Sequence, residues 1–196
     1  MKLVKSSFAA VAAAACTLIA GQALAARPPV YFRAPMEFKG TGCPGQNSVS
    51  IIGENTDTLT IMFDQYDAAN PPKNAVSKLK RSACSFSVPV HVPQGFQMSI
   101  MTADWRGYAE GSTALHREYF FAGQRGPRKD SKPRGDFVIT DKLKHATFSP
   151  CGAGDVTLRI NSSVRAQSDP SYIAVDTVDL KNKTKVVFHM KWQKCR

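Results

Sequence analysis

The sequence lacks the motifs that identify many hydrolases, nucleotide-binding proteins and zinc proteins. It contains no G-x-S-x-G nucleophile elbow, no H-E-x-x-H pair and no phosphate-binding loop. It also has no C-x-x-C pair, and its cysteines lie tens of residues apart, which argues against a zinc site. These absences favour a binding or structural role over catalysis, and we expect neither a metal ion nor a cofactor.

Long apolar runs are missing except at the N-terminus. There, two lysines precede an alanine-rich stretch that ends in Ala-Leu-Ala, the pattern of a secretory signal peptide cleaved after Ala25. The stretch is too short and too rich in alanine for a membrane-spanning helix. Lipidation of Cys16 is a competing interpretation, but the apolar run continues past that residue. We therefore expect residues 1–25 to be a signal peptide and residues 26–196 to be one secreted or periplasmic domain without a transmembrane segment.

Acidic residues are few relative to basic ones. The chain has 26 Lys and Arg against 15 Asp and Glu, a formal net charge of +11, and removing the two signal-peptide lysines leaves +9. This charge favours an anionic partner such as a polysaccharide, a nucleic acid, lipopolysaccharide or an acidic protein. It also suits the solubility of a secreted protein, so charge alone does not choose a partner.

Helical periodicity is almost absent. Short alternating runs separated by Gly, Pro, Asn, Asp and Ser predict antiparallel strands instead. Eight to ten such strands without a long helix indicate an all-β fold, an antiparallel β-sandwich. Pro89 lacks a backbone donor, so we expect its strand to lie at a sheet edge or to carry a bulge. The predicted strands span 58–66, 84–92, 95–104, 113–123, 136–140, 156–164, 172–180 and 184–192.

Four cysteines remain after loss of the signal peptide. An even number in an exported chain indicates two disulfides, with three connectivities open. The predicted 156–164 strand follows Cys151, and the 184–192 strand ends near Cys195. If these strands lie side by side and antiparallel, their cysteines meet and Cys43 pairs with Cys84. Each disulfide would close a loop of about 40 residues, worth roughly 4 kcal/mol through its effect on the unfolded chain.

A set of segments occurs in a distinctive order: GTGCPGQNSVSI, LTIMFDQYDA, KRSACSFSVPVHVPQGFQMSI, ADWRGYAEG, EYFFAGQ, FSPCGAG and FHMKWQKC. Together with the four cysteines, this set resembles the secreted proteins known as domain of unknown function 4360, from about Gly40 to Cys195. The resemblance implies an exported, disulfide-containing, mainly β domain and supplies no activity. The segment that follows EYFFAGQ is more basic here than the resemblance leads one to expect.

The segment DWRGYAEG contains the first candidate ligand-binding residues, Trp105, Arg106 and Tyr108. Exposed aromatic rings beside a guanidinium are groups that recognise sugars and other polar rings. In the competing interpretation, which we favour, Trp105 is a core residue, Gly107 occupies a special backbone position and Arg106 pairs with Asp104.

The segment RGPRKDSKPRGD (125–136) supplies the second candidate site. Its two prolines stiffen the chain, and arginine binds phosphate, sulfate or carboxylate through its planar fork. It has no interleaved aromatic residues, which argues against single-stranded nucleic acid. The Arg-Gly-Asp tripeptide is common in loops, and we treat it as chance. The candidate ligand-binding residues here are Arg125, Arg128, Lys129, Lys132 and Arg134.

One further pair could in principle support acid–base chemistry. His116 and Glu118 lie on the same side of a predicted strand. We interpret them as an ordinary polar face. The sequence therefore predicts an exported, non-catalytic binding or surface-interaction module for an anionic glycan or envelope polymer. The alternatives are a structural cell-envelope or matrix protein and a secreted hydrolase or hydrolase inhibitor. The sequence does not address the oligomeric state.

Overall fold

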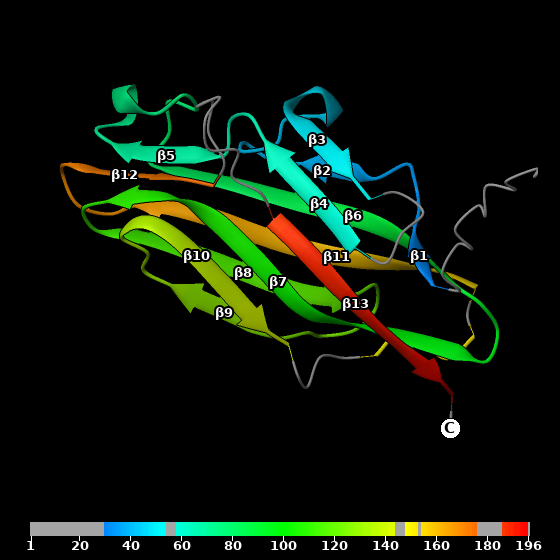
Figure 1. The fold of residues 1–196 in the computed structure, drawn as a ribbon. Helices are drawn as coiled ribbons and strands as arrows, with labels where there is room; N and C mark the ends of the chain where they lie inside the picture. Colours follow the sequence, from blue (N-terminus) through cyan, green and yellow to red (C-terminus); the bar gives the residue numbers. More distant parts are fainter. Residues whose placement is uncertain (1–29, 54–57, 144–147, 153, 176–185, 196) are drawn as a thin grey trace, which may run out of the picture.

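The protein consists of two antiparallel β-sheets packed face to face (Figure 1). The computed structural model describes residues 30–53, 58–143, 148–152, 154–175 and 186–195, so the predicted signal peptide lies outside the described residues. These residues form thirteen strands and two short 3-10 helices, η1 (Gln46–Ser48) and η2 (Pro72–Asn74). The predicted all-β sandwich with two disulfides is confirmed. No helix in these ranges is long and apolar enough to cross a membrane.

We name the two sheets after two of their long strands, β6 and β7. The β6 sheet has the order β1-β6-β11-β8-β9, and β2 also pairs with β6. Its strands are β1 (Tyr31–Phe32), β2 (Glu37–Lys39), β6 (Arg81–Val92), β8 (Thr113–Phe121), β9 (Arg128–Ser131) and β11 (Gly154–Ala166).

The β7 sheet has the order β3-β4-β13-β7-β12-β5, and β10 also pairs with β7. Its strands are β3 (Val49–Ile52), β4 (Thr58–Phe63), β5 (Asp67–Asn70), β7 (Phe96–Glu110), β10 (Gly135–Lys142), β12 (Ser171–Ala174) and β13 (Val186–Lys194).

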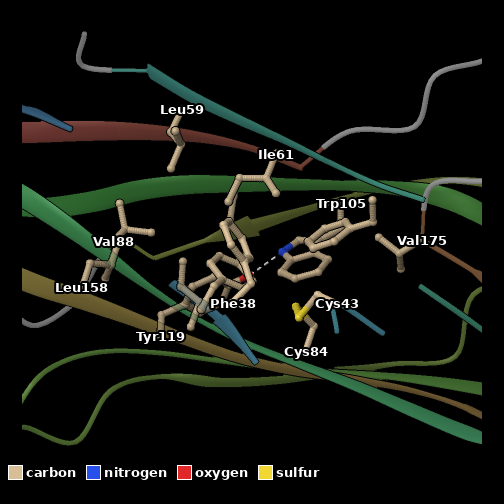
Figure 2. Close-up of a cluster of buried hydrophobic side chains, with 14 of the residues drawn as sticks. Phe38, Cys43, Leu59, Ile61, Cys84, Val88, Trp105, Tyr119, Leu158 and Val175 are labelled. Carbon is tan, nitrogen blue, oxygen red and sulfur yellow. Dashed lines mark hydrogen bonds between the residues drawn. A yellow bond between two sulfur atoms is a disulfide. The ribbon is translucent and has the colours of Figure 1, made fainter. Parts of the chain in front are cut away.

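The hydrophobic core lies between the two sheets and follows from the period-two alternation of the strands (Figure 2). In β6, Phe86, Val88 and Val90 are buried, while Ser87 and Pro89 between them are half-buried. Burying one such apolar side chain stabilises the fold by about 1.5–3 kcal/mol. Because β4, β6 and β8 each bury every second side chain, this alternation fixes which of their side chains remain outside and available for binding.

Pro89 lies in an interior strand, so the prediction of an edge position or a bulge is wrong. The register of β6 with β11 is continuous from Arg81 to Val92. On the other side of β6, the Pro89 carbonyl accepts a hydrogen bond from the Arg33 backbone nitrogen at 2.8 Å. The nitrogen and oxygen of one strand residue point to the same side, so the Pro89 nitrogen faces the connection between β1 and β2. No bond to β11 is lost there.

The disulfides join Cys43 to Cys84 and Cys151 to Cys195, as predicted. The reasoning for the second pair was wrong, because β11 and β13 belong to different sheets. Both of its cysteines are instead anchored at the turn that opens β7. The Cys195 nitrogen donates to the carbonyl of Gly95 at 2.8 Å, and the nitrogen of Gly152 donates to Phe96 at 2.9 Å.

Candidate ligand-binding site

The structure divides the first candidate site between the two faces of β7. Trp105 is fully buried, and its indole nitrogen donates a hydrogen bond to the Tyr119 hydroxyl at 2.6 Å (Figure 2). It therefore presents no surface to a ligand, and the interpretation of Trp105 as an exposed aromatic is corrected to a core role. Arg106 and Tyr108 have the opposite parity along the strand and are exposed.

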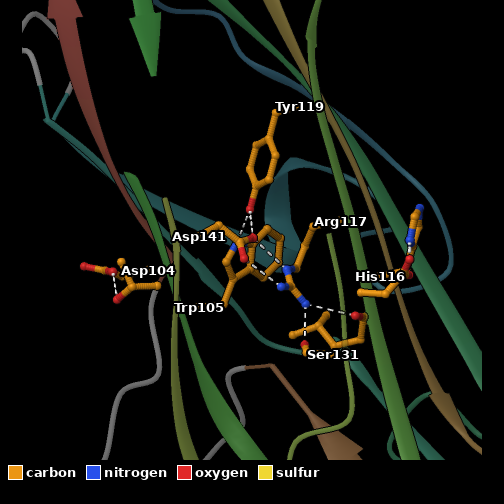
Figure 3. Close-up of polar contacts among 10 residues, drawn as sticks. Asp104, Trp105, His116, Arg117, Tyr119, Ser131 and Asp141 are labelled. Carbon is orange, nitrogen blue, oxygen red and sulfur yellow. Dashed lines mark hydrogen bonds and ion pairs between the residues drawn. The ribbon is translucent and has the colours of Figure 1, made fainter. Parts of the chain in front are cut away.

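A buried charged network, which the sequence interpretation missed, lies beside Trp105 (Figure 3). Arg117 on β8 makes two hydrogen bonds of 2.8 Å to Asp141 on β10. The Tyr119 hydroxyl donates to the same carboxylate at 2.5 Å, and Arg117 also donates to the Ser131 hydroxyl at 2.6 Å. Arg117 is only 1% exposed. The alternation of residues 113–121 places Arg117 on the inward side of the strand, and this signal in the sequence could have revealed the network.

Within the core, the positive charge of Arg117 in this network is balanced by the negative charge of Asp141. Burial, followed by the charge of Asp141, raises the pKa of Tyr119 well above its usual value of 10.0. Burial alone would lower the pKa of Arg117, but the hydrogen bonds and charge of Asp141 outweigh it and raise that pKa. Because the groups satisfy one another away from solvent, the network ties the two sheets together and is not an open catalytic site.

Gly107 holds Arg106 and Tyr108 in place. A β-carbon at Gly107 would lie 2.1 Å from the carbonyl oxygen of Ala174 and 2.6 Å from the ring of Phe137. No larger residue fits without moving a neighbouring strand, so glycine is required here by this close approach and not by an unusual backbone conformation. Among the described residues, Arg106 forms no ion pair with its predicted partner Asp104, whose carboxylate accepts a hydrogen bond from Thr140 at 2.6 Å.

Tyr108 is part of an aromatic pair on the outward face of the β7 sheet. It is 42% exposed, and its ring centroid lies 6.5 Å from that of Tyr172 on β12, with the planes inclined by 41°. Partial burial, followed by the charge of Asp67, raises the pKa of Tyr172 to about 12. The Tyr172 ring is therefore neutral at physiological pH. Both rings offer apolar faces with polar tips.

The predicted basic loop is in part a strand, β9, at the edge of the β6 sheet (Figure 1). Four extended residues span about 13 Å and only two of the five cations lie among them, so the five do not form one patch. Arg128 lies 3.5 Å from Asp130, and Lys129 is half-buried. Arg125, Lys132 and Arg134 are exposed and lie outside β9.

A hollow brings the two candidate sites together. The β7–β10 ladder pairs Gly135 with Ala109, so the preceding residue, Arg134, lies beside the end of β7. Within the part of the chain that the structure describes, Arg106 and Arg134 form no ion pair. The hollow has a volume of about 430 Å³ and is lined by Tyr108, Ala109, Glu110, Gly111, Arg134 and Gly135.

His116 is held in place by a hydrogen bond to Asp130, but in the described part of the chain it makes no hydrogen bond to a side chain that it could activate as a nucleophile. Its Nδ1 lies 2.7 Å from Asp130, and that hydrogen bond is the main cause of the lowered pKa of Asp130. Ser163 is directly opposite His116 in the β8–β11 register. Among the described residues, no hydrogen bond joins the Ser163 hydroxyl to the imidazole, which a serine–histidine nucleophile requires. The same residues contain no cluster of three or more His, Cys, Asp or Glu side chains arranged to hold a metal ion.

Comparison with known proteins places the chain among uncharacterised relatives. A family model described as "Domain of unknown function (DUF4360)" matches residues 34–195. A protein of Arthroderma benhamiae described as "Uncharacterized secreted protein" is 31% identical over 173 residues, which cover 81% of this chain and 69% of that protein.

Two solved structures align over most of the chain with low scores. TmCBM61 in complex with β-1,4-galactotriose gives a TM-score of 0.37 at 10% identity, covering 83% of this chain and 90% of that one. The enzymatically active domain of bacteriophage CBA120 tailspike protein 4 gives 0.26 at 9% identity, covering 82% of this chain and 19% of that one. Similarity at this level supports no inference about a ligand.

Proposed function

Because the chain belongs to the family described as domain of unknown function DUF4360 and is a secreted protein, we propose that it is a non-catalytic module that binds an acidic polysaccharide. The contact surface is the hollow beside Tyr108, together with Arg106 on the same outward face of β7. The observation that carries the proposal is the exposed ring of Tyr108 in one hollow with Arg134, a guanidinium without an ion pair among the described residues.

The chemistry of the hollow suits a sugar that carries a carboxylate. The face of Tyr108 can stack on the apolar side of a sugar ring, and the guanidinium of Arg134 can form two parallel hydrogen bonds to a carboxylate. Glu110 can accept hydrogen bonds from sugar hydroxyls. A charge-assisted hydrogen bond contributes about 1.5–3 kcal/mol, so a site of this size binds one short oligosaccharide segment weakly.

The mixed charge of the site argues against a densely charged polyanion. Glu110 lines the hollow, and Asp136 lies directly opposite Tyr108 in the β7–β10 register. These carboxylates repel closely spaced phosphates or sulfates, whereas a polysaccharide with one carboxylate per sugar can place its charge at Arg134. An acidic polysaccharide therefore fits better than a nucleic acid, and its binding is expected to weaken as salt is added.

The test uses oligogalacturonate and a neutral galactan oligomer of equal length, with the oxidised secreted protein, in isothermal titration calorimetry. We expect binding of the acidic oligomer only. Tyr108→Ala and Arg134→Ser should each weaken it about tenfold, equivalent to about 1.4 kcal/mol. The matched control is Arg165→Ser, an exposed arginine on the other sheet that should bind as the wild type does.

Three results would overturn the proposal. The first is equal binding by the wild type and both hollow variants, and the second is no binding of the acidic oligomer at all. The third is shortening of the oligomer during a long incubation with the wild type, which would make the protein a hydrolase. Chromatography of the oligomer after the titration detects that outcome.

A further inference from the structure

A second depression, here called the trough, lies on the outward face of the β6 sheet. It has a volume of about 210 Å³, room for about seven water molecules at about 30 Å³ each. Its lining consists of Glu37, Lys39, Ser85, Phe86, Ser87, Phe120, Arg159 and Asn161. The hollow beside Tyr108 lies on the other sheet and faces the opposite side of the molecule.

The trough follows from the sizes of side chains in two rows across the sheet. One row runs from Glu37 through Ser87 and Arg159 to Phe120, each residue opposite the next on β2, β6, β11 and β8. Small serine side chains on β6 therefore lie between longer side chains on both sides and form the floor. Neighbouring strands are about 4.8 Å apart, so the row spans roughly 14 Å.

A parallel row lies two residues away along the strands. Lys39 is opposite Ser85, and Ser85 is opposite Asn161. The two rows are separated by about 7 Å. Together they surround the floor with hydroxyl, amide, carboxylate and cationic groups over an area wide enough for a ring-shaped polar ligand.

The polar side chains of the trough are not engaged by one another. Across the described segments, Glu37, Lys39 and Arg159 form no ion pair within 4.0 Å. The side chains of Ser87 and Asn161 likewise have no hydrogen-bond partner among those residues. Polar groups gathered in a depression without internal partners remain available to a ligand.

The charges identify the class of ligand. Among the residues that line the trough, Glu37 balances one of the two cations, which leaves a single positive charge for one ligand carboxylate. The fork of Arg159 can hold that carboxylate, while serine, asparagine and Glu37 suit sugar hydroxyls. Phe120 is half-buried and offers an apolar ring edge or face at the end of the row.

We propose that the trough is a second binding site for an acidic sugar, so that the protein bridges two polysaccharide chains. The trough site follows from its own geometry, and the bridging rests on the function proposed for the hollow. Packed sheets lie about 10 Å apart, and the two sites face away from each other. A single extended chain cannot reach both without wrapping around the sandwich, whereas two chains can be joined.

The test compares three variant proteins with the wild type. A hollow variant carries Tyr108→Ala and Arg134→Ser, and a trough variant carries Arg159→Ser and Asn161→Ala. The control is Arg165→Ser, on the outward face of the same strand as Arg159 and about 20 Å from it. The altered side chains are exposed or half-buried, and thermal unfolding checks that each variant is folded.

We expect the wild type to bind two molecules of trigalacturonate and each double variant to bind one, with affinity at the altered site reduced at least tenfold. Light scattering should show cross-linking of long polygalacturonate by the wild type and the control but by neither double variant.

The outcomes separate the two proposals. One bound molecule that is lost only in the hollow variant overturns the trough site and supports the hollow. One bound molecule that is lost only in the trough variant supports the trough and overturns the function proposed for the hollow. Unchanged cross-linking by the trough variant, or a wild type that binds no oligomer, overturns the bridging.

Discussion

The guanidinium of Arg117 and the carboxylate of Asp141 face each other across the core and join the two sheets. Their two hydrogen bonds are each 2.8 Å, and both residues are almost completely buried (Figure 3). Arg117 comes from β8 in one sheet and Asp141 from β10 in the other. β10 also pairs with the part of β7 that carries Arg106 and Tyr108, so this pair anchors the strand beside the proposed hollow.

Removing one member of this pair should destabilise the protein strongly. Arg117→Met leaves the Asp141 carboxylate buried without its cation, which costs about 3–5 kcal/mol in the free energy of unfolding. Joint replacement by Arg117→Met and Asp141→Leu removes both charges and should be less destabilising than the single change. Urea unfolding measures both effects, with the exposed Arg165→Met as the control. A loss below about 1 kcal/mol for Arg117→Met would contradict a buried, mutually satisfied pair.

Stability should fall at alkaline pH because of the raised tyrosine pKa values. Burial raises the pKa of Tyr66 and Tyr119, while in the unfolded chain both groups titrate near 10.0. Their contribution to the free energy of unfolding is complete below pH 10. It is lost as the pH rises from 10 toward the folded-state pKa, because in that range the tyrosines of the unfolded chain release their protons while those of the folded protein do not. The loss is up to about 1.4 kcal/mol per pH unit for each buried tyrosine.

The alkaline effect can be assigned with one substitution. Tyr119→Phe removes a titrating group, so its unfolding free energy should depend less steeply on pH between about 10 and 11 than that of the wild type. Urea unfolding on a time scale shorter than alkaline disulfide breakdown supplies the measurement. Equal slopes for the two proteins would show that Tyr119 is not held neutral in the folded state.

The disulfides should differ in their resistance to reduction. Cys43 and Cys84 are fully buried, whereas Cys151 is exposed and Cys195 half-buried. Thiol–disulfide exchange requires access of the attacking thiolate, so the Cys151–Cys195 bond should open first under mild reductant. Alkylation followed by peptide mass spectrometry identifies the opened pair. Earlier labelling of Cys43 and Cys84 would contradict this order.

Sequence alternation predicted the larger strands but not the shortest ones. All eight predicted strands are present, although residues 176–180 of one and residues 184–185 of another lie outside the described residues. The five additional strands, β1, β2, β3, β5 and β9, have four residues or fewer, too few to establish a period. The same alternation places Arg117 on the inward side, but only His116 and Glu118, on the other side of that strand, were considered as a candidate site.

Contacts between distant segments could not be predicted from alternation. The second disulfide was predicted from an adjacency of strands that the fold does not contain. The hollow likewise depends on the register that pairs Gly135 with Ala109, which brings Arg134 to Tyr108. Single-strand patterns carry no information on such pairing, because register is chosen by the packing of the whole sheet.

The central claim is that an acidic sugar occupies the hollow beside Tyr108. The most direct measurement is a nuclear magnetic resonance titration of the isotopically labelled, oxidised secreted protein with trigalacturonate. The account predicts saturable shifts of the backbone amides of Tyr108, Glu110, Gly111 and Gly135, and loss of these shifts in Arg134→Ser. Amides of these four residues that stay unchanged at saturating ligand would contradict it.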